Sequence, residues 1–233
     1  MPLEPRLAIV GYGKMGRLIE QLAPEYGFSV ALKLDEFNNA NCEGVTADNF
    51  KDIAVAVDFS IPAAVPENVD RIASLGVNIV VGTTGWLAEM ERVKAAVASH
   101  GIGLVWSPNY SIGVNAFFRL AAEAARLLAS EPTYGAWAWE IHHATKKDAP
   151  SGTLLKLVDV MRQAGYSRTI DTAASRAGAH PGTHEIGFDS AADTITLRHT
   201  ARSREGFARG ALKAAQWIVG KQGFHEFADI LFQ

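Results

Sequence analysis

The sequence contains a single cysteine, Cys42, in 233 residues. One cysteine excludes an internal disulfide and makes a thiolate metal site implausible, which fits a reducing compartment. Cys42 falls in a polar stretch, and we expect it to be incidental.

Long hydrophobic runs and basic clusters are also missing. The segment 1–6 lacks the basic-then-apolar order of a secretory signal, and no apolar run is long enough to span a bilayer. The formal net charge is -3, and lysine and arginine do not gather into the basic run that phosphate-backbone binding needs. We therefore expect a cytoplasmic protein that binds neither nucleic acid nor membrane.

What the chain does have is the composition of a globular protein, with 48% hydrophobic and 20% charged residues in a length that suits one large domain or two small ones. In the first half, short apolar runs alternate with helical patterns. Strands are expected at 7–10, 29–34, 54–60, 77–81 and 103–106. This alternation predicts an α/β fold with a doubly wound, Rossmann-like parallel sheet.

A glycine turn, Gly-Tyr-Gly-Lys-Met-Gly at 11–16, follows the first expected strand. The Gly-x-Gly-x-x-Gly spacing serves a tight turn, close approach to a pyrophosphate and packing of helix on strand. Asp35 ends the second expected strand, close to the ~20-residue spacing of the acid that binds an adenosine ribose, although an ordinary loop acid would also fit there. Together they predict a dinucleotide site.

Two later strand ends carry small polar residues and glycines, at 82–85 (Gly-Thr-Thr-Gly) and 107–113 (Ser-Pro-Asn-Tyr-Ser-Ile-Gly). Ligands of open α/β sheets bind at the carboxyl ends of strands. Both loops are therefore candidates for ligand contact.

The stretch 140–153 reads Glu-Ile-His-His-Ala-Thr-Lys-Lys-Asp-Ala-Pro-Ser-Gly-Thr. A strand is expected before it at 137–141 and a helix after it at 154–161. Ser151 can cap that helix and leave the next three amides, of Gly152, Thr153 and Leu154, unpaired at the positive end of the helix dipole. Such a helix start binds anions such as carboxylates.

The same stretch holds two histidines and two lysines. An imidazole passes protons near neutral pH, and an ammonium donates a proton or stabilises negative charge. Singly, each has an ordinary explanation, as strand-end histidines, solvated lysines and a helix cap, but their combination in one loop favours a function. Adjacent histidines on a strand point to opposite faces, and no Asp, Glu or Cys completes a plausible ligand set, so no metal is expected.

The pattern His-His-x-x-Lys-x-Asp-Ala-Pro-Ser-Gly-Thr resembles the signature of the 4-hydroxy-tetrahydrodipicolinate (dihydrodipicolinate) reductase family. The resemblance implies nicotinamide-dependent reduction of that cyclic dicarboxylate to tetrahydrodipicolinate, with loss of water, in lysine and diaminopimelate biosynthesis. By the same resemblance, His142 would be the general acid and Lys146 the second proton donor or charge stabiliser, and Lys147 would have no role. The resemblance also implies a homotetramer formed through the sheet of the middle domain. Substrate would be held by His143, Ser151, Gly152 and Thr153.

The same resemblance implies NADH or NADPH as cofactor. Asp35 suits a ribose hydroxyl, whereas Lys33 could meet a 2′-phosphate, so the preference stays open. The family often has one more residue in its first glycine turn, which leaves the details of pyrophosphate contact undefined. Expected cofactor contacts are Gly11, Tyr12, Gly13, Lys14, Met15, Gly16, Asp35, Ser60, Gly82, Thr83, Thr84, Pro108, Asn109, Tyr110 and Ser111.

We predict a dinucleotide-binding domain at 1–113 and 203–233, and a smaller α/β domain at 114–202 with a mostly antiparallel sheet for substrate binding and oligomerisation. A long helix at 114–129 is interpreted as core, and the second domain is expected to be shortened between Tyr166 and Arg176. The reaction is expected in the cleft between the domains.

Two alternative functions would share the first domain: a dehydrogenase of another amino or semialdehyde acid, and a non-catalytic nucleotide sensor. Neither needs the loop at 140–153.

Overall fold

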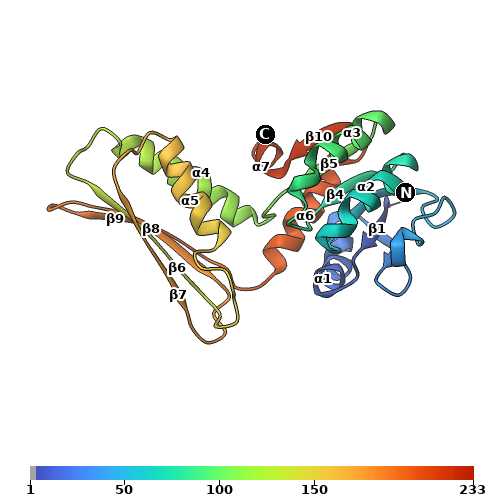
Figure 1. Ribbon diagram of the computed structural model, residues 1–233, viewed down its shortest axis with the longest axis horizontal. Coiled ribbons are helices and arrows are strands. Elements are labelled where there is room, and N and C mark those ends of the chain that lie inside the picture. The colour runs from blue at the N-terminus through green and yellow to red at the C-terminus, as the bar shows by residue number, and fades with distance from the viewer. Residues whose placement is uncertain (1–3) are drawn as a thin grey trace. The chain divides into compact units, whose positions relative to one another are not determined.

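The two ends of the chain fold together, and the middle folds separately (Figure 1). In the computed structural model, which describes residues 4–233, unit 1 comprises the chain up to Ser111 together with Glu205–Gln233, and unit 2 is Ile112–Arg204. The boundaries predicted from sequence, after 113 and after 202, lie two residues from these.

Unit 1 is built on a six-stranded parallel sheet. Its order is β10-β5-β4-β3-β1-β2. The strands are β1 (Arg6–Val10), β2 (Ser29–Leu34), β3 (Ile53–Asp58), β4 (Asn78–Val81), β5 (Gly103–Trp106) and β10 (Gly223–Glu226). The chain lays β2 on one side of β1 and then returns to lay β3 on the other, so the strand order reverses at β1. Ligands of doubly wound sheets bind at such a reversal.

Helices cover both faces of this sheet (Figure 1). One layer holds α1 (Lys14–Leu22) against α6 (Glu205–Ile218), and the other holds α2 (Val65–Ser74) against α3 (Met90–His100). The central strands are accordingly apolar and buried on both faces, as in β3 and β4. Shorter elements are η1 (Ala23–Tyr26), η2 (Ala40–Cys42), η3 (Pro62–Ala64), η4 (Leu87–Glu89) and α7 (Phe227–Ile230). The predicted doubly wound fold is confirmed.

Unit 2 packs two helices, α4 (Ile112–Leu128) and α5 (Gly152–Gln163), on one face of a four-stranded sheet (Figure 1). The order is β7-β6-β8-β9, with β6 parallel to β7 and the other pairs antiparallel. The predicted mostly antiparallel sheet is therefore also confirmed. The strands are β6 (Gly135–His142), β7 (Ile170–Arg176), β8 (Thr183–Asp189) and β9 (Thr194–Thr200).

Strand β6 alternates between buried and half-buried residues. Its buried side chains, from Ala136 to His142, face the helices, and Trp137, Trp139 and Ile141 face the other way. Because the period of a strand is two, Glu140 and His142 lie on the same face. The sequence at the end of β6 thereby places a carboxylate and an imidazole side by side.

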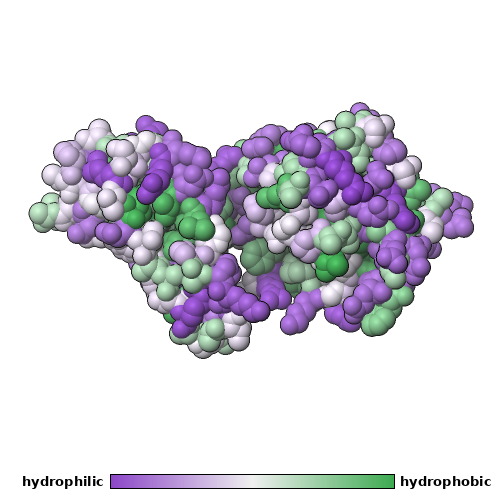
Figure 2. Space-filling view, in the orientation of Figure 1, coloured by the Kyte–Doolittle hydropathy of each residue, from purple (hydrophilic) through white to green (hydrophobic). Residues whose placement is uncertain are grey.

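The interpretation of the helix at 114–129 as core was only partly right. In α4, Phe117, Ala121 and Ala125 are buried, but Leu120 and Leu127 are 57% and 58% exposed. Leu155 of α5 is also a large hydrophobic residue that is mostly exposed, at 57%. Figure 2 shows hydrophobic surface on unit 2 where its helices run.

Among residues 4–233, no helix is both long and apolar enough to cross a membrane.

Helix α6 lies close to the backbone of unit 1, which gives a test of the packing. A Cβ at Gly210 would overlap the carbonyl oxygen of Tyr110, whereas one at Gly206, a turn earlier, would lie 3.5 Å from Ser111 Oγ in ordinary contact. Gly210→Ala should therefore lower the free energy of unfolding by about 1–3 kcal/mol. Gly206→Ala should change the free energy of unfolding by no more than a few tenths of a kcal/mol, or raise it, because alanine favours helix. Urea unfolding measures both, and equal midpoints would contradict the packing.

Candidate functional site

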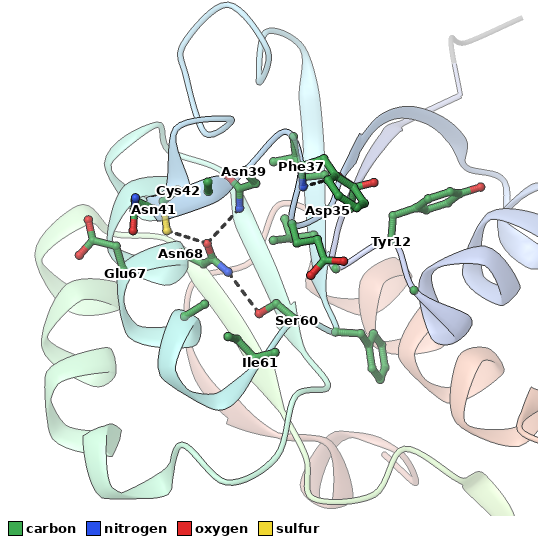
Figure 3. A pocket seen from close by; sticks show the side chains of 18 of the residues that line it. Tyr12, Asp35, Phe37, Asn39, Asn41, Cys42, Ser60, Ile61, Glu67 and Asn68 are labelled. Atoms are coloured by element: carbon green, nitrogen blue, oxygen red, sulfur yellow. Dashed lines mark hydrogen bonds between the residues drawn. The ribbon is translucent and has the colours of Figure 1, made fainter.

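Two adjoining cavities lie at the carboxyl ends of the unit 1 strands. The larger, about 940 Å³, is bordered by the loops after β1, β2 and β3, and Figure 3 shows Tyr12, Asp35 and Ser60 on its walls. The smaller, about 460 Å³, is lined by residues that include Lys14, Met15, Gly82, Thr83 and Thr84. Both linings include Gly13, Phe59 and Ser60, so the two hollows meet there. An extended ligand with two halves would fit this arrangement.

The glycines of the first turn are required by close backbone contacts. Gly11 has a φ of +91°, and a Cβ there would overlap the backbone of Phe59. A Cβ at Gly16 would lie 2.7 Å from the carbonyl oxygen of Gly11. The amides of Gly11 and Tyr12 both donate to Leu34 O, at 2.8 and 2.9 Å, so the turn is joined to the end of β2. Side chains would push these strand ends apart.

The start of α1 is open to an anion. Within residues 4–233 no side chain caps this helix and its first turn holds no acidic residue. The first amides of a helix have no intrahelical acceptor, and they point outward with the positive end of the dipole. Lys14 and Met15, the first residues of α1, line the smaller cavity. A pyrophosphate in this cavity would satisfy those amides.

A buried carboxylate, Asp58 at the end of β3, joins the loops around the cavities. Its Oδ1 accepts from the amide and hydroxyl of Ser60, at 2.9 and 2.7 Å, and from Thr83 Oγ1 at 2.8 Å. Its Oδ2 accepts from Asn68 Nδ2 at 2.9 Å. Burial raises the pKa of Asp58, and these hydrogen bonds only partly oppose that effect. Sequence reasoning missed this residue, because the signal lay in which donors the fold brings to it.

Asp35 and its neighbours form the wall at the end of β2 (Figure 3). One oxygen of Asp35 accepts from the amides of Phe37 and Asn38, at 2.9 and 3.3 Å. Glu36 also lines the larger cavity. Lys33 Nζ instead binds Glu20 Oε1 at 2.9 Å and lies over the Tyr12 ring, so its charge is already paired. That pairing disfavours a role for Lys33 in holding a 2′-phosphate.

The expectation that Cys42 is an incidental residue of a polar loop was wrong about its surroundings. The thiol is 4% exposed and its Sγ lies 2.9 Å from Asn68 Oδ1, beside the larger cavity (Figure 3). Burial raises the pKa of Cys42. The thiol is thus a neutral packing group next to Asn68, which in turn binds Asp58.

The loop at 108–111 does not contribute to the linings of these two cavities. Asn109 Oδ1 accepts from the Ser111 amide at 2.9 Å, and the Asn109 amide donates to Ser107 Oγ at 3.1 Å. The Tyr110 hydroxyl is buried and donates to the carbonyls of Val81 and Val105, which holds the ring in the core. The cofactor contacts expected of Pro108, Asn109, Tyr110 and Ser111 stay predictions.

In unit 2 the candidate residues surround the fully buried carboxylate of Glu140. Its Oε1 accepts from the Ser151 amide and from Arg176, each at 2.9 Å. Its Oε2 accepts from the Ser151 hydroxyl, and lies 3.2 Å from His184 Nε2 and 3.6 Å from His142 Nδ1. The rings of His142 and His184 meet edge to face, with centroids 5.0 Å apart. Sequence patterns did not single out His184 or Arg176, which reach the site from β8 and β7.

Burial sets the ionisation of this cluster. It lowers the pKa of His184 to about 4, with His142 adding to the effect and Glu140 opposing it. It also lowers the pKa of His142, where Glu140 opposes the shift and Lys146 and Arg176 reinforce it. Burial alone would raise the pKa of Glu140, but the hydrogen bonds from Ser151 and Arg176 outweigh it and lower that pKa. At neutral pH the cluster is one carboxylate beside two mainly neutral imidazoles.

The loop after β6 arranges the remaining predicted residues. His143 Nδ1 lies 2.8 Å from Thr145 Oγ1, which fixes the ring against its own loop. Lys146 Nζ pairs with Asp148 Oδ1 at 2.8 Å, and this bond lowers the pKa of Asp148. Lys147 is exposed, in keeping with its having no assigned role.

Ser151 caps α5 as expected, but with a different consequence. Its Oγ accepts from the Leu154 amide at 3.2 Å, so that amide is not available to a ligand, contrary to expectation. Ser151 is 3% exposed and its side chain is engaged by Glu140, which argues against direct contact between this hydroxyl and substrate. Gly152 is exposed, and a Cβ there would have no atom within 4 Å. The available amides are those of Gly152 and Thr153.

The prediction that no Asp, Glu or Cys stands near the histidines to complete a ligand set was wrong. Glu140, His142 and His184 each offer a ligand atom, and these atoms lie within 4.8 Å of one another. However, both carboxylate oxygens already accept hydrogen bonds, and the Arg176 cation lies 2.9 Å from one of them. A metal ion would have to displace these donors and approach a buried guanidinium. The geometry therefore favours a hydrogen-bonded cluster over a metal centre.

Two family models match the chain. The model described as Dihydrodipicolinate reductase, N-terminus, matches residues 5–110, and the one described as Dihydrodipicolinate reductase, C-terminus, matches residues 113–231. Together they span both units.

Individual proteins agree with these models. The chain is 33% identical to a 4-hydroxy-tetrahydrodipicolinate reductase of Christiangramia forsetii, covering 97% of each chain, and 34% identical to one of Methanococcoides burtonii, covering 94% of this chain and 95% of the other. A solved structure, dipicolinate-bound dihydrodipicolinate reductase from Paenisporosarcina sp. TG-14, shares the fold with a TM-score of 0.81 at 20% identity, covering 97% of this chain and 99% of that one.

Proposed function

Because the chain belongs to the dihydrodipicolinate reductase family, we propose that it reduces 4-hydroxy-tetrahydrodipicolinate to tetrahydrodipicolinate with a nicotinamide dinucleotide. Each turnover consumes one hydride and one proton and releases one water, in lysine and diaminopimelate biosynthesis. The observation that carries the proposal is the loop at 140–153, where proton donors and cations stand beside the open start of α5. Another dehydrogenase or a nucleotide sensor would leave this loop unexplained.

The substrate is a dianion, and the loop offers it two kinds of partner. The amides of Gly152 and Thr153 at the start of α5 can receive one carboxylate, and glycine lets it approach closely. The same loop adds the ammonium of Lys146, which pairs with Asp148, and the ring of His143, whose Nδ1 meets Thr145 Oγ1. Binding by backbone amides requires no change of protonation, so it fixes the substrate before the proton moves.

We assign proton donation to His142, with Lys146 as a second donor or charge stabiliser. The lowered pKa of His142 keeps its ring mainly neutral near pH 7. Arrival of a dianion beside the ring raises that pKa, since opposite charge favours the protonated form. The bound substrate thus favours protonation of His142, which then donates that proton to the substrate.

The cavity at the end of β2 favours NADH over NADPH. Asp35 and Glu36 both line it, and Lys33 is already paired with Glu20. A carboxylate accepts hydrogen bonds from ribose hydroxyls and repels a 2′-phosphate. Arg17 and Arg71 also line the cavity, but Arg71 is bonded to Glu67 and Arg17 lies over the Tyr12 ring. The two acids at the end of β2 therefore support a preference for NADH.

We also propose that the chain is a cytoplasmic homotetramer. The single, buried, reduced cysteine suits a reducing compartment. Within residues 4–233, the helices of unit 2 pack on one face of its sheet, and the other face presents Trp137, Trp139 and Ile141 from β6. Large apolar side chains on an uncovered sheet face suit association with a second copy.

The assembly is tested by mass in solution. Light scattering should give four times the 25.0 kDa of one chain, and Trp139→Glu should shift the mass to smaller species because it places a charge in the contact. Leu127→Glu, on an exposed position of α4, is the matched control and should leave the mass unchanged. A monomeric wild type, or an equal effect of both variants, would contradict this assembly.

Cofactor preference is tested by dissociation constants for NADH and NADPH. NADH should bind at least ~10-fold more tightly. Asp35→Ala should weaken NADH more than NADPH, since it removes both a hydrogen-bond acceptor and a repulsion of the 2′-phosphate. Glu36→Gln should strengthen NADPH binding alone. Asp48→Asn, an exposed acid outside the cavity, serves as control. Equal losses of both cofactors in Asp35→Ala would remove Asp35 from ribose recognition.

The reaction itself is tested with the product of the preceding synthase, following nicotinamide absorbance. Wild type should oxidise the cofactor only when that product is present. Gly152→Ala should raise KM by ~10-fold, because its methyl stands in the path of the carboxylate and meets nothing in the protein, and should spare the Kd of NADH. Gly135→Ala, where a Cβ would lie 4.0 Å from Asp189 O, is the matched control. Unchanged kinetics in Gly152→Ala would move the carboxylate elsewhere.

A further inference from the structure

Glu140 is the least exposed ionised group of the loop at 140–153 and its surroundings, and it contacts every element that forms this site. It lies on β6, receives the amide and hydroxyl of Ser151 at the start of α5, and pairs with Arg176 from β7 and His184 from β8. A buried carboxylate is tolerated only when its lone pairs are satisfied. Here the donors come from three other elements, so the carboxylate holds those elements together.

One edge of His142 faces this carboxylate. Its Nδ1 is buried and has no hydrogen-bond partner within residues 4–233, and Glu140 Oε2 lies 3.6 Å away. A neutral imidazole carries its proton on one of two nitrogens, and the neighbouring group decides which. A carboxylate beside Nδ1 favours the proton on Nδ1.

The opposite edge of His142 faces a position without a side chain. A Cβ at Gly182 would lie 3.0 Å from both Nε2 and Cδ2 of the ring, closer than side chains normally pack. Gly182 also has a φ of +131°, which disfavours other residues. The space beside Nε2 therefore depends on glycine at 182, directly before β8.

We propose that Glu140 is the positioning residue for His142: it keeps a proton on Nδ1 so that Nε2 is the atom that exchanges protons, and through Ser151 it fixes the start of α5. This inference deepens the proposed function and rests on it where it concerns catalysis. One carboxylate then sets two geometries together, the orientation of the acid and the placement of the amides of Gly152 and Thr153.

The charges around His142 explain why the carboxylate is needed. Lys146 from the loop and Arg176 from β7 both disfavour a second proton on the ring, as does His143, and His184 from β8 lies against it. Glu140 is the anion that opposes them. Without its charge, His142 would hold a second proton only at lower pH.

The first test needs no variant. Two-bond nitrogen–proton correlation spectra of the wild-type protein, with histidines labelled, report which nitrogen of His142 is protonated. The proposal requires Nδ1–H as the main neutral form. A main Nε2–H form would overturn it whether or not the enzyme is active.

The second test is Glu140→Gln, which keeps shape and removes charge. The limb of the kcat profile that falls as pH rises through the pKa of His142 should move to lower pH by about one unit, so that kcat at pH 7.5 drops ~10-fold. The Kd of NADH should stay unchanged. A merely structural role predicts a uniform loss of kcat at every pH, and that result would overturn the proposal.

Two further variants separate the two parts of the proposal, the tautomer of His142 and the position of the start of α5. Ser151→Ala keeps the charge of Glu140 and the bond from the amide of residue 151, but removes the hydroxyl that joins Glu140 to the cap of α5. It should raise KM for the dicarboxylate without moving the pH limb. Glu185→Gln, the carboxylate one residue after His184, pairs with Arg198 and should leave the His142 tautomer unchanged. If Glu140→Gln does not fold, the wild-type tautomer and the kinetics of Ser151→Ala still decide: Nε2–H, or a shifted limb in Ser151→Ala, overturns the proposal.

The wild-type assay and the wild-type tautomer test different claims. A wild type that does not turn over the synthase product would refute the reductase activity. The tautomer measurement would still show whether Glu140 keeps the proton on Nδ1 of His142. An active wild type with the wrong tautomer would refute the role of Glu140 alone.

Discussion

A buried carboxylate must be fully hydrogen-bonded, and this constraint organises the site residues in both units. Asp58 ends β3 and gathers donors from Ser60, Asn68 and Thr83, so the strand-end loops of unit 1 are held at fixed distances around the cavities. Glu140 does the same in unit 2 for Ser151, Arg176 and His184. In each case the donors come from different elements, and burying the acid orders the loops that carry the chemistry.

The two carboxylates differ in what they do to charge. Burial dominates at Asp58, where the donors are hydroxyls, an amide group and a backbone N–H, and its pKa is raised. At Glu140 the guanidinium of Arg176 joins the donors, and the pKa is lowered. The carboxylate beside the cofactor cavities therefore acts mainly as a hydrogen-bond acceptor. The one beside His142 also supplies the negative charge on which the ionisation of that ring depends.

Sequence patterns predicted what is local and missed what is long-range. Strands β2 and β5 begin and end where expected, because each is a short, mainly apolar run with polar residues or glycine near its ends, although β5 is buried and β2 is an edge strand in which only Leu34 is buried. Strand β7 was missed, since it lies at the sheet edge with only Ile170 buried. Glu140 is the first residue of the stretch 140–153, but its role was not predicted, because it depends on Arg176 and His184, which reach it from other strands. For the same reason the buried surroundings of Cys42 were not foreseen.

The ion pairs of the substrate loop explain why backbone amides matter for a dicarboxylate. Lys146 is paired with Asp148, and Arg176 with Glu140, so much of the positive charge is neutralised within the protein. A dianion that relied on those cations would have to compete with their partners, one of which is buried. Within residues 4–233, the amide of Leu154 is bonded to Ser151 Oγ, and no side chain caps the amides of Gly152 and Thr153. The helix start can therefore hold a carboxylate while the cations stay in place to stabilise charge and move protons.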